Sequence, residues 1–195
     1  MCGRYAINTE DEIIEIREIL KEISKRITED KFKNYDKFGS DAYPGVTAPI
    51  ITPDNKLTKG IWGFEKWDGK GIIFNARSEG LIASRFFSKH ISDGRCIVPA
   101  KSYYEWYKSD IDKKIKYSIY DSANKPLYMA GLMKNDSAGN ISYVVITKAA
   151  NDNIKFIHDR MPLLLTENEA VSWISPEFIS KLLLSDSVRV DYKLV

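Results

Sequence analysis

The residue with the most distinctive chemistry in this 195-residue chain is Cys2, which directly follows Met1. Methionine aminopeptidases remove Met1 readily when the next residue is small, and the mature chain would then carry an α-amine and a thiol on one residue. The α-amine, with a pKa of about 8, is partly neutral and nucleophilic near pH 7, and the thiol is the stronger nucleophile where its neighbours favour the thiolate. An aldehyde that meets this 1,2-aminothiol can form a Schiff base and then close to a thiazolidine. Position alone does not establish such a role, because any residue can follow Met and a retained Met1 would block the amine.

Glu105 is the carboxylate with the most unusual sequence surroundings. It stands in the aromatic run 102–107, where strand alternation places Tyr103, Glu105 and Tyr107 on one face. A carboxylate among aromatic rings would be desolvated, which raises its pKa and suits a general acid or base near neutral pH. The alternative is a solvent-facing Glu on an amphipathic strand.

Only two histidines occur, His90 and His158. His90 stands at the expected end of a helix, where we interpret it as a surface residue. His158 lies in the polar turn 158–162 between two apolar runs, where it is either a functional group or an ordinary loop residue. The two His and two Cys are not closely spaced, so no structural zinc site is predicted, and no cofactor or metal is expected.

The segment 75–79 follows an apolar run and begins with Asn75 and Arg77. An Asn side chain donates and accepts hydrogen bonds at once, and the guanidinium fork of Arg suits phosphate; an ordinary polar helix start is the alternative. Trp62 and several dispersed arginines are candidates for contact with a polynucleotide, because aromatic faces stack on bases and Arg pairs with phosphates. A core position for Trp62 is the competing interpretation. The arginines are Arg4, Arg77, Arg85, Arg95 and Arg160.

Composition narrows the class of protein. Lys and Arg number 29 against 27 Asp and Glu, so affinity for nucleic acid would depend on local clustering of Arg. The two cysteines, Cys2 and Cys96, do not suggest a disulfide framework, and a reduced cytosolic compartment is expected. There is no apolar signal segment and no apolar run near 18 residues, so neither conventional secretion nor a membrane span is predicted. The length suits a single domain over residues 1–195.

The elements that must position these residues are mainly short strands. A helix is predicted over 9–27, with a Thr9–Glu12 capping box, and further helices over 79–91, 166–174 and 176–184. Strands are predicted at 47–52, 59–66, 71–75, 95–99, 102–108, 115–121, 127–133, 141–148 and 188–194. Many strands with few helices indicate an α+β fold with a curved, barrel-like antiparallel β core and peripheral helices.

Several short motifs, in this order along nearly the whole chain, resemble those of the SOS response-associated peptidase (SRAP) family of abasic-site processing proteins. They are Met1-Cys2-Gly3-Arg4-Tyr5, Trp62-Gly63, Asn75-Ala76-Arg77-Ser78-Glu79, Arg95-Cys96-Ile97-Val98-Pro99-Ala100, Tyr104-Glu105-Trp106 and His158-Asp159-Arg160-Met161-Pro162. The segment 41–49 departs from the family's pattern, so no contact is assigned to it, and Cys96 is expected in the core.

The resemblance implies a compact barrel-like domain with a positively charged groove for single-stranded DNA. It implies that Cys2, exposed by Met1 removal, crosslinks to the open-chain aldehyde of an abasic site. Glu105 would shuttle protons beside the Cys2 amine, His158 would assist sugar ring opening and protonate the departing oxygen, and Asn75 would orient Cys2 or the deoxyribose. The residues implied in DNA binding are Arg4, Trp62, Arg77, Arg85, Trp106, Arg160, Met161 and Pro162.

The implied partner is abasic single-stranded DNA, bound by a cytoplasmic, nucleoid-associated monomer. Two other functions remain open from the sequence. One is a cysteine peptidase or amidase with Cys2 as nucleophile and His158 as base. The other is a noncatalytic module that binds single-stranded DNA. A weak lyase activity could accompany the crosslinking, because a Schiff base at an abasic site also promotes β-elimination.

Overall fold

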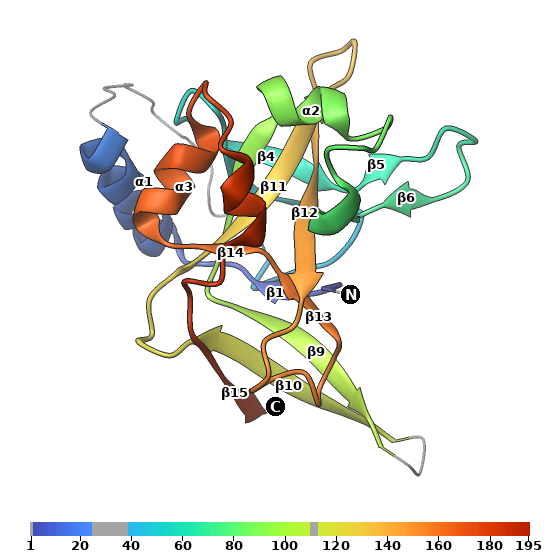
Figure 1. The fold of residues 1–195 in the computed structure, drawn as a ribbon, viewed down its shortest axis with the longest axis vertical. Helices are drawn as coiled ribbons and strands as arrows, with labels where there is room; N and C mark the ends of the chain where they lie inside the picture. Colours follow the sequence, from blue (N-terminus) through green and yellow to red (C-terminus); the bar gives the residue numbers. More distant parts are fainter. Residues whose placement is uncertain (1, 25–38, 110–112) are drawn as a thin grey trace.

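The core of the protein is a closed β-barrel, seen in a computed structural model that describes residues 2–24, 39–109 and 113–195 (Figure 1). Five strands close the barrel, because β11 and β12 at the two ends of the series also pair with each other. In order around the barrel these are β12 (Ile141–Ala149), β4 (Leu57–Trp62), β3 (Thr47–Ile51), β8 (Arg95–Ala100) and β11 (Leu127–Asn135). The predicted barrel-like β core is therefore confirmed.

One seam of the barrel differs from the antiparallel arrangement that the sequence predicted. β12 pairs with β4 in parallel, with Ser142 opposite Ile61 and Tyr143 opposite Trp62, whereas the other four seams are antiparallel. A parallel pair needs a long crossover connection. The chain between Trp62 and Ile141 supplies that connection and also carries several residues of the candidate site.

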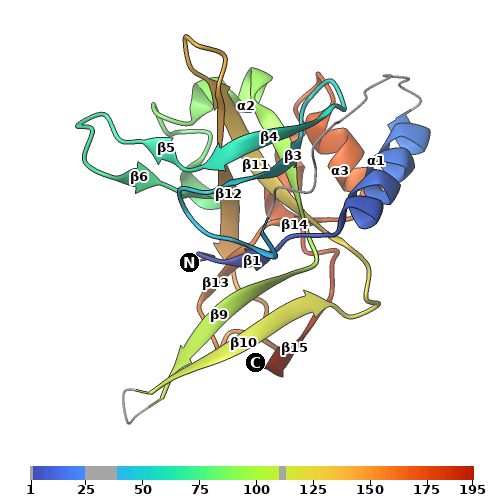
Figure 2. The same ribbon diagram turned by 180° about the vertical axis from the view of Figure 1, so that it is seen from behind.

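A second sheet of five strands extends below the barrel in the views of Figures 1 and 2. Only Lys101 separates β8 from β9, so the chain passes directly from the barrel into this sheet. Its strands, in spatial order, are β15 (Val190–Leu194), β10 (Lys114–Asp121), β9 (Ser102–Lys108), β1 (Tyr5–Ala6) and β2 (Asp41–Ala42).

Five short strands complete the β structure. β5 and β6 form a hairpin, β7 pairs in parallel with β12, β13 pairs antiparallel with β12, and β14 pairs with β11. Their bounds are Phe64–Glu65, Ile72–Ile73, Asn75–Arg77, Arg160–Pro162 and Leu164–Leu165. The sequence predicted no strand over 160–165. Because β7 and β13 both pair with β12, this strand brings the segments that carry Asn75 and His158 to one end of the barrel.

The helices are peripheral, as predicted, but two of them are shorter than expected. α1 (Glu10–Ser24) and α3 (Glu167–Ile174) begin with the predicted capping boxes, and residues 25–27 of the first predicted helix lie outside the described residues. The helix predicted over 79–91 was wrong for most of its length, since 3-10 helix η2 (Ser78–Gly80) and turns precede α2 (Ser88–Asp93). Near the C-terminus only the 3-10 helix η3 (Ser180–Leu184) forms.

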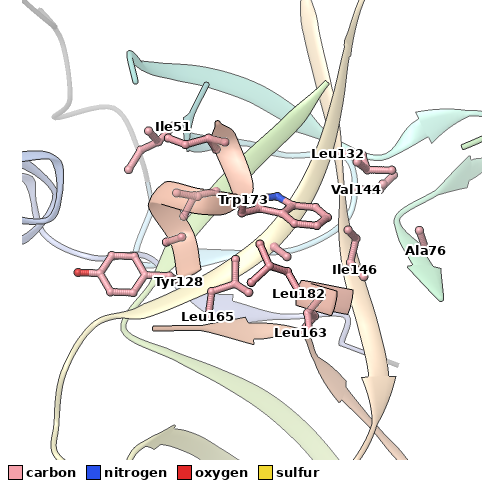
Figure 3. Close-up of a cluster of buried hydrophobic side chains, with 14 of the residues drawn as sticks. Ile51, Ala76, Tyr128, Leu132, Val144, Ile146, Leu163, Leu165, Trp173 and Leu182 are labelled. Carbon is pink, nitrogen blue, oxygen red and sulfur yellow. The ribbon is translucent and has the colours of Figure 1, made fainter. Parts of the chain in front are cut away.

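Trp173 on α3 anchors the helices to the barrel. Figure 3 shows its indole among aliphatic side chains of the barrel strands and of η3. The indole nitrogen donates to the carbonyl oxygens of Cys96 and Gly131, at 3.0 and 3.3 Å. Gly131 has no room for a side chain, because a Cβ there would lie 2.9 Å from the Cys96 sulfur. The buried position of Cys96 confirms the prediction of a core residue.

Within the part of the chain that the structure describes, no helix has the length and apolar character needed to cross a membrane.

Candidate active site

Cys2 lies at the centre of the candidate site, just before β1, which pairs with β9 on one side and β2 on the other. The residue is fully buried, with 0% of its surface exposed. Its carbonyl oxygen accepts a hydrogen bond of 2.8 Å from the side-chain amide of Asn75, the first residue of β7. The side-chain oxygen of Asn75 is buried and has no hydrogen-bond partner within the described residues. Asn75 therefore fixes the backbone of Cys2 and keeps one acceptor free. Met1 lies outside the described residues.

Aromatic residues form the floor beneath Cys2. The hydroxyl groups of Tyr5 and Tyr143 are 2.6 Å apart, and Trp62 packs on both rings at centroid distances of 5.1 and 6.3 Å. The Trp62 indole also donates to the carbonyl oxygen of Phe74 at 2.8 Å. Because Trp62 is fully buried, no base can stack on its face in this conformation. Its place in the structure is support for the floor, as the core interpretation of the sequence anticipated.

Glu105 is buried on the face of β9 that points toward the site, with 3% of its surface exposed. This excludes the alternative of a solvent-facing carboxylate. Burial raises the pKa of Glu105 to about 7, and the negative charge of Asp159 adds to the rise. A carboxyl group with this pKa exchanges protons readily near neutral pH, as a general acid or base must.

Tyr103 is a polar member of the site to which the sequence assigned no role. It shares the Glu105 face of β9, as strand alternation predicted, and it is fully buried. Burial raises the pKa of its hydroxyl well above the ordinary value, and negative charge on Cys2 or Glu105 would raise it further. The hydroxyl has no hydrogen-bond partner within the residues described. Tyr103 therefore places a protonated donor beside the thiol and the carboxyl group.

The thiol of Cys2 is held in its neutral form. Burial raises the pKa of this thiol strongly, and the negative charge of Glu105 raises it further. A cysteine protease needs the opposite environment, because its nucleophile is a thiolate stabilised by a neighbouring cation. The free site thus contains a thiol rather than a preformed thiolate.

His158 lies at the mouth of the site, two residues before β13 begins. Burial lowers the pKa of this imidazole, so the neutral form is favoured at neutral pH. Its Nδ1 accepts the backbone N–H of Arg160 at 2.9 Å and lies 2.9 Å from a carboxylate oxygen of Asp159. Because Nδ1 accepts a hydrogen bond from Arg160, the proton of the neutral imidazole lies on Nε2. If Nδ1 were also protonated, it would become a donor, and the Asp159 carboxylate would be its acceptor.

The arginines implied in DNA binding have different environments. Arg77 and Arg85 are exposed, and Arg4 is half-buried with its guanidinium 6.0 Å from the ring centroid of Tyr43. Arg160 is only 12% exposed and forms two hydrogen bonds with the carboxylate of Glu79, at 2.5 and 2.9 Å. A phosphate could reach Arg160 only by competing with Glu79.

Three further residues implied in DNA contact offer little open surface beside the site. Met161 and Pro162 are buried on β13, which pairs with β12. Trp106 is half-buried on the face of β9 opposite to Glu105. Trp67, in the turn between β5 and β6, is 92% exposed and was missed in the sequence. The sequence indicated its exposure only by the polar residues that surround Trp67 in the run 65–71.

No group of three or more His, Cys, Asp or Glu side chains that could hold a metal ion occurs within residues 2–24, 39–109 and 113–195.

The site lies in a chain that is similar to known proteins along nearly its full length. The family model described as SOS response associated peptidase (SRAP) matches residues 1–189. Abasic site processing protein YoqW of Bacillus subtilis is 32% identical over 194 residues, which cover 91% of this chain and 81% of the relative. Abasic site processing protein YedK of Escherichia coli is 29% identical over 191 residues, covering 93% of this chain and 82% of the relative.

A solved structure of a protein from Bacteroides thetaiotaomicron shares the fold. Its TM-score is 0.82 at 23% sequence identity, and the match covers 100% of this chain and 92% of that one. Together with the family match over residues 1–189, these findings show that the chain belongs to the SOS response-associated peptidase (SRAP) family.

Proposed function

We propose that this protein processes abasic sites in single-stranded DNA by forming a covalent thiazolidine through Cys2 after Met1 is removed. The observation that carries the proposal is that Cys2 and a buried carboxyl group lie in one site. The Cys2 carbonyl oxygen accepts a 2.8 Å hydrogen bond from Asn75, and the pKa of the nearby Glu105 is about 7. The names of the relatives, which are abasic site processing proteins, support the same activity.

The first chemical step is attack of the neutral Cys2 amine on the aldehyde carbon of the ring-opened deoxyribose. The nitrogen forms a bond to carbon, and the carbonyl oxygen becomes the hydroxyl of a carbinolamine. Loss of water then gives the imine. Glu105 accepts the proton that the amine must lose and returns it to the departing hydroxyl, a cycle that suits a group with a pKa of about 7.

The second step is ring closure by the thiol. The sulfur adds to the imine carbon, its proton passes to the nitrogen, and a saturated five-membered ring results. A thiol held neutral by burial is a poor competitor of the amine for the aldehyde, which supports attack by the amine first. The same property disfavours the peptidase alternative, in which the thiolate would have to attack first.

His158 and Tyr103 act as hydrogen-bond donors toward the sugar. The neutral tautomer of His158 carries its proton on Nε2, which can donate a hydrogen bond to the ring oxygen as the deoxyribose opens, and transfer of the proton itself requires the imidazolium form. The Tyr103 hydroxyl can donate to the carbinolamine oxygen. The spare side-chain oxygen of Asn75 can accept from the amine or from a sugar hydroxyl.

The DNA backbone would be held by the cations around the site. Arg4, Arg77 and Arg85 are accessible to phosphates, and Arg160 becomes available when Glu79 is displaced. Trp67 offers the exposed aromatic face that the buried Trp62 lacks. A single strand fits this arrangement because no complementary strand covers the abasic deoxyribose that the amine must reach.

Intact mass spectrometry tests the proposal directly. The protein is weighed before and after incubation with a single-stranded oligonucleotide that contains one abasic site. A chain without Met1 that gains the oligonucleotide mass less one water supports the proposal, and a chain without Met1 that gains nothing contradicts it. A chain found to retain Met1 is first trimmed with an aminopeptidase, and the same two outcomes then apply.

The two cysteines provide a matched pair of variants. Cys2→Ala should lose the crosslink, and Cys96→Ala should keep it, although both thiols are fully buried and both have raised pKa values. Cys2→Ser keeps the amine without the thiol, so its imine cannot be trapped as a thiazolidine. We expect that variant to cleave more DNA strand per crosslink, and an unchanged ratio would exclude the amine as the attacking group.

A further inference from the structure

Four aromatic side chains form a continuous cluster on the sheet face that carries Glu105. Tyr117 packs against Phe156 at a ring-centroid distance of 6.0 Å and against Tyr192 at 5.7 Å. Phe156 also contacts Tyr192 at 5.2 Å and Tyr107 at 6.4 Å. We call these four residues the aromatic platform. Its members come from β9, β10, β15 and the turn before β13.

The aromatic platform is open to solvent. Phe156 is 49% exposed and Tyr192 is 42% exposed, although each is large and packed on other rings. Leu194, two residues along β15 on the same face, is 64% exposed. Contiguous exposed apolar surface on a folded protein indicates a site of interaction. These rings leave faces or edges available to a further flat group.

The platform adjoins the candidate active site through three connections. Tyr117 is the register partner of Glu105 across β10 and β9, which places their Cβ atoms about 5 Å apart on the same face. Tyr107 follows Glu105 by two residues, a spacing of about 7 Å along the strand. Phe156 precedes His158 by two residues in the turn before β13. A ligand centred on Cys2 and Glu105 would therefore extend directly over the platform.

An exposed cation borders the platform. Lys155 precedes Phe156, whereas the exposed register pair Lys108 and Lys114 lies on the opposite face of the sheet by strand alternation. Aromatic faces combined with nearby cations are the combination that binds single-stranded nucleic acid, since bases stack while phosphates pair with Lys.

We propose that the aromatic platform binds the nucleobase next to the abasic nucleotide. This proposal rests on the proposed function and adds a specific subsite to it. An abasic nucleotide leaves each neighbouring base without a stacking partner on one face. The platform offers a replacement partner at about one nucleotide's distance from Glu105, so it recognises the base that borders the gap. One side of the lesion is then held more tightly than the other.

The test is a thermodynamic cycle between protein and DNA. Oligonucleotides carry a tetrahydrofuran analogue, which lacks the aldehyde and so binds without crosslinking, and fluorescence anisotropy measures the affinity. In separate oligonucleotides the flanking base on the 5′ side or the 3′ side is also removed. For the natural chain we expect removal on one side to weaken binding by between about 5-fold and 150-fold, the range for one stacked base.

Variants of the platform should lose the same interaction. Phe156→Ala and Tyr192→Ala should bind the intact-flank oligonucleotide more weakly and should be insensitive to removal of the flanking base. Phe156→Tyr keeps an aromatic ring, so its binding should again weaken when the flanking base is removed. If Phe156 only positioned the His158 loop, the variants would not change this dependence on the flanking base. Tyr120→Ala is the matched control, because Tyr120 lies on β10 with its ring beside Lys193 and outside the platform.

Three results would overturn the proposal. One is a natural chain whose affinity does not change when either flanking base is removed. Another is a loss in the variants that simply adds to the loss from base removal. The third is a dimer of the natural chain that dissociates in Phe156→Ala, which would assign the platform to a second copy of the chain instead. Crosslinking to an ordinary abasic oligonucleotide is measured in parallel, so failure of the proposed function is distinguished from failure of the subsite.

Discussion

Replacing Glu105 with Gln should change the pH dependence of stability in a defined direction. Burial raises the pKa of this carboxyl group to about 7, from an ordinary value of 4.5. The folded protein therefore holds the proton over a pH range in which the unfolded chain releases it. The resulting contribution to stability is fully present below pH 4.5 and is lost as the pH rises through 7.

The size of the effect follows from the two pKa values. The full difference corresponds to about 3 kcal/mol of unfolding free energy, and about 2.5 kcal/mol of it is lost between pH 5 and pH 8. Gln has nearly the same shape and does not titrate. The stability of Glu105→Gln relative to the natural chain should therefore increase by this amount over the same range. In melting temperature the increase is about 5 to 10 °C for a chain of this length.

Denaturant unfolding of both chains at pH 5, 6, 7 and 8 measures the difference between their unfolding free energies. Contributions from the other titrating groups are common to both chains and cancel in this difference. Glu65→Gln, which replaces the exposed carboxylate of β5, is the control. A constant difference between the natural chain and Glu105→Gln would refute the reasoning, because it would mean that Glu105 titrates near its ordinary value. The crosslinking rate of Glu105→Gln should rise with pH only as the amine loses its proton, near its pKa of about 8, and should lack the added rise through about 7 that Glu105 gives the natural chain.

Three further outcomes are expected. Asn75→Ala removes the 2.8 Å hydrogen bond to the N-terminal cysteine and should slow crosslinking with little change in affinity for the tetrahydrofuran analogue; unchanged rates would remove Asn75 from the site. Gly131→Ala brings a Cβ within 2.9 Å of the Cys96 sulfur and should cost about 1–3 kcal/mol in denaturant unfolding. A fully stable variant would show that the barrel can relax there. Glu79→Gln releases Arg160, so affinity for single-stranded DNA should rise and the log–log salt slope should steepen by about 0.7. An unchanged slope would show that Arg160 meets no phosphate.

The strands and capping boxes were predictable from sequence because each depends on local pattern. Strand alternation placed Tyr103 and Glu105 on one face, and Thr166 with Glu169 marked the start of α3. The parallel seam between β4 and β12 was not predictable, since it joins residues about eighty positions apart and leaves no local signal. The short strand β13 was missed for the same reason, because its pairing with β12 alone defines it.

The candidate site was predictable in its residue types, whereas its burial was predictable only in part. Cys2, Glu105 and His158 could be chosen for their chemistry, whereas exposure depends on what the rest of the chain places over each residue. Trp62 and Trp67 illustrate this, because both are tryptophans near glycine in similar stretches, yet one is fully buried and the other is 92% exposed. The ion pair of Arg160 with Glu79 likewise joins segments 81 residues apart.

The dispersal of the site along the chain has a consequence for the newly synthesised protein. Cys2 leaves the ribosome first, whereas Glu105 and His158 follow after more than a hundred and more than a hundred and fifty residues. At about 5–20 residues per second, the reactive terminus waits roughly 10 to 30 s for its partners. If Met1 is removed and Cys2 acts as proposed, the exposed aminothiol can react during that time with any free aldehyde in the cell, without the selectivity of the folded site. A nascent chain stalled before His158 should accordingly be labelled by small aldehydes but should not capture DNA, and rapid barrel closure would then protect the nucleophile for its substrate.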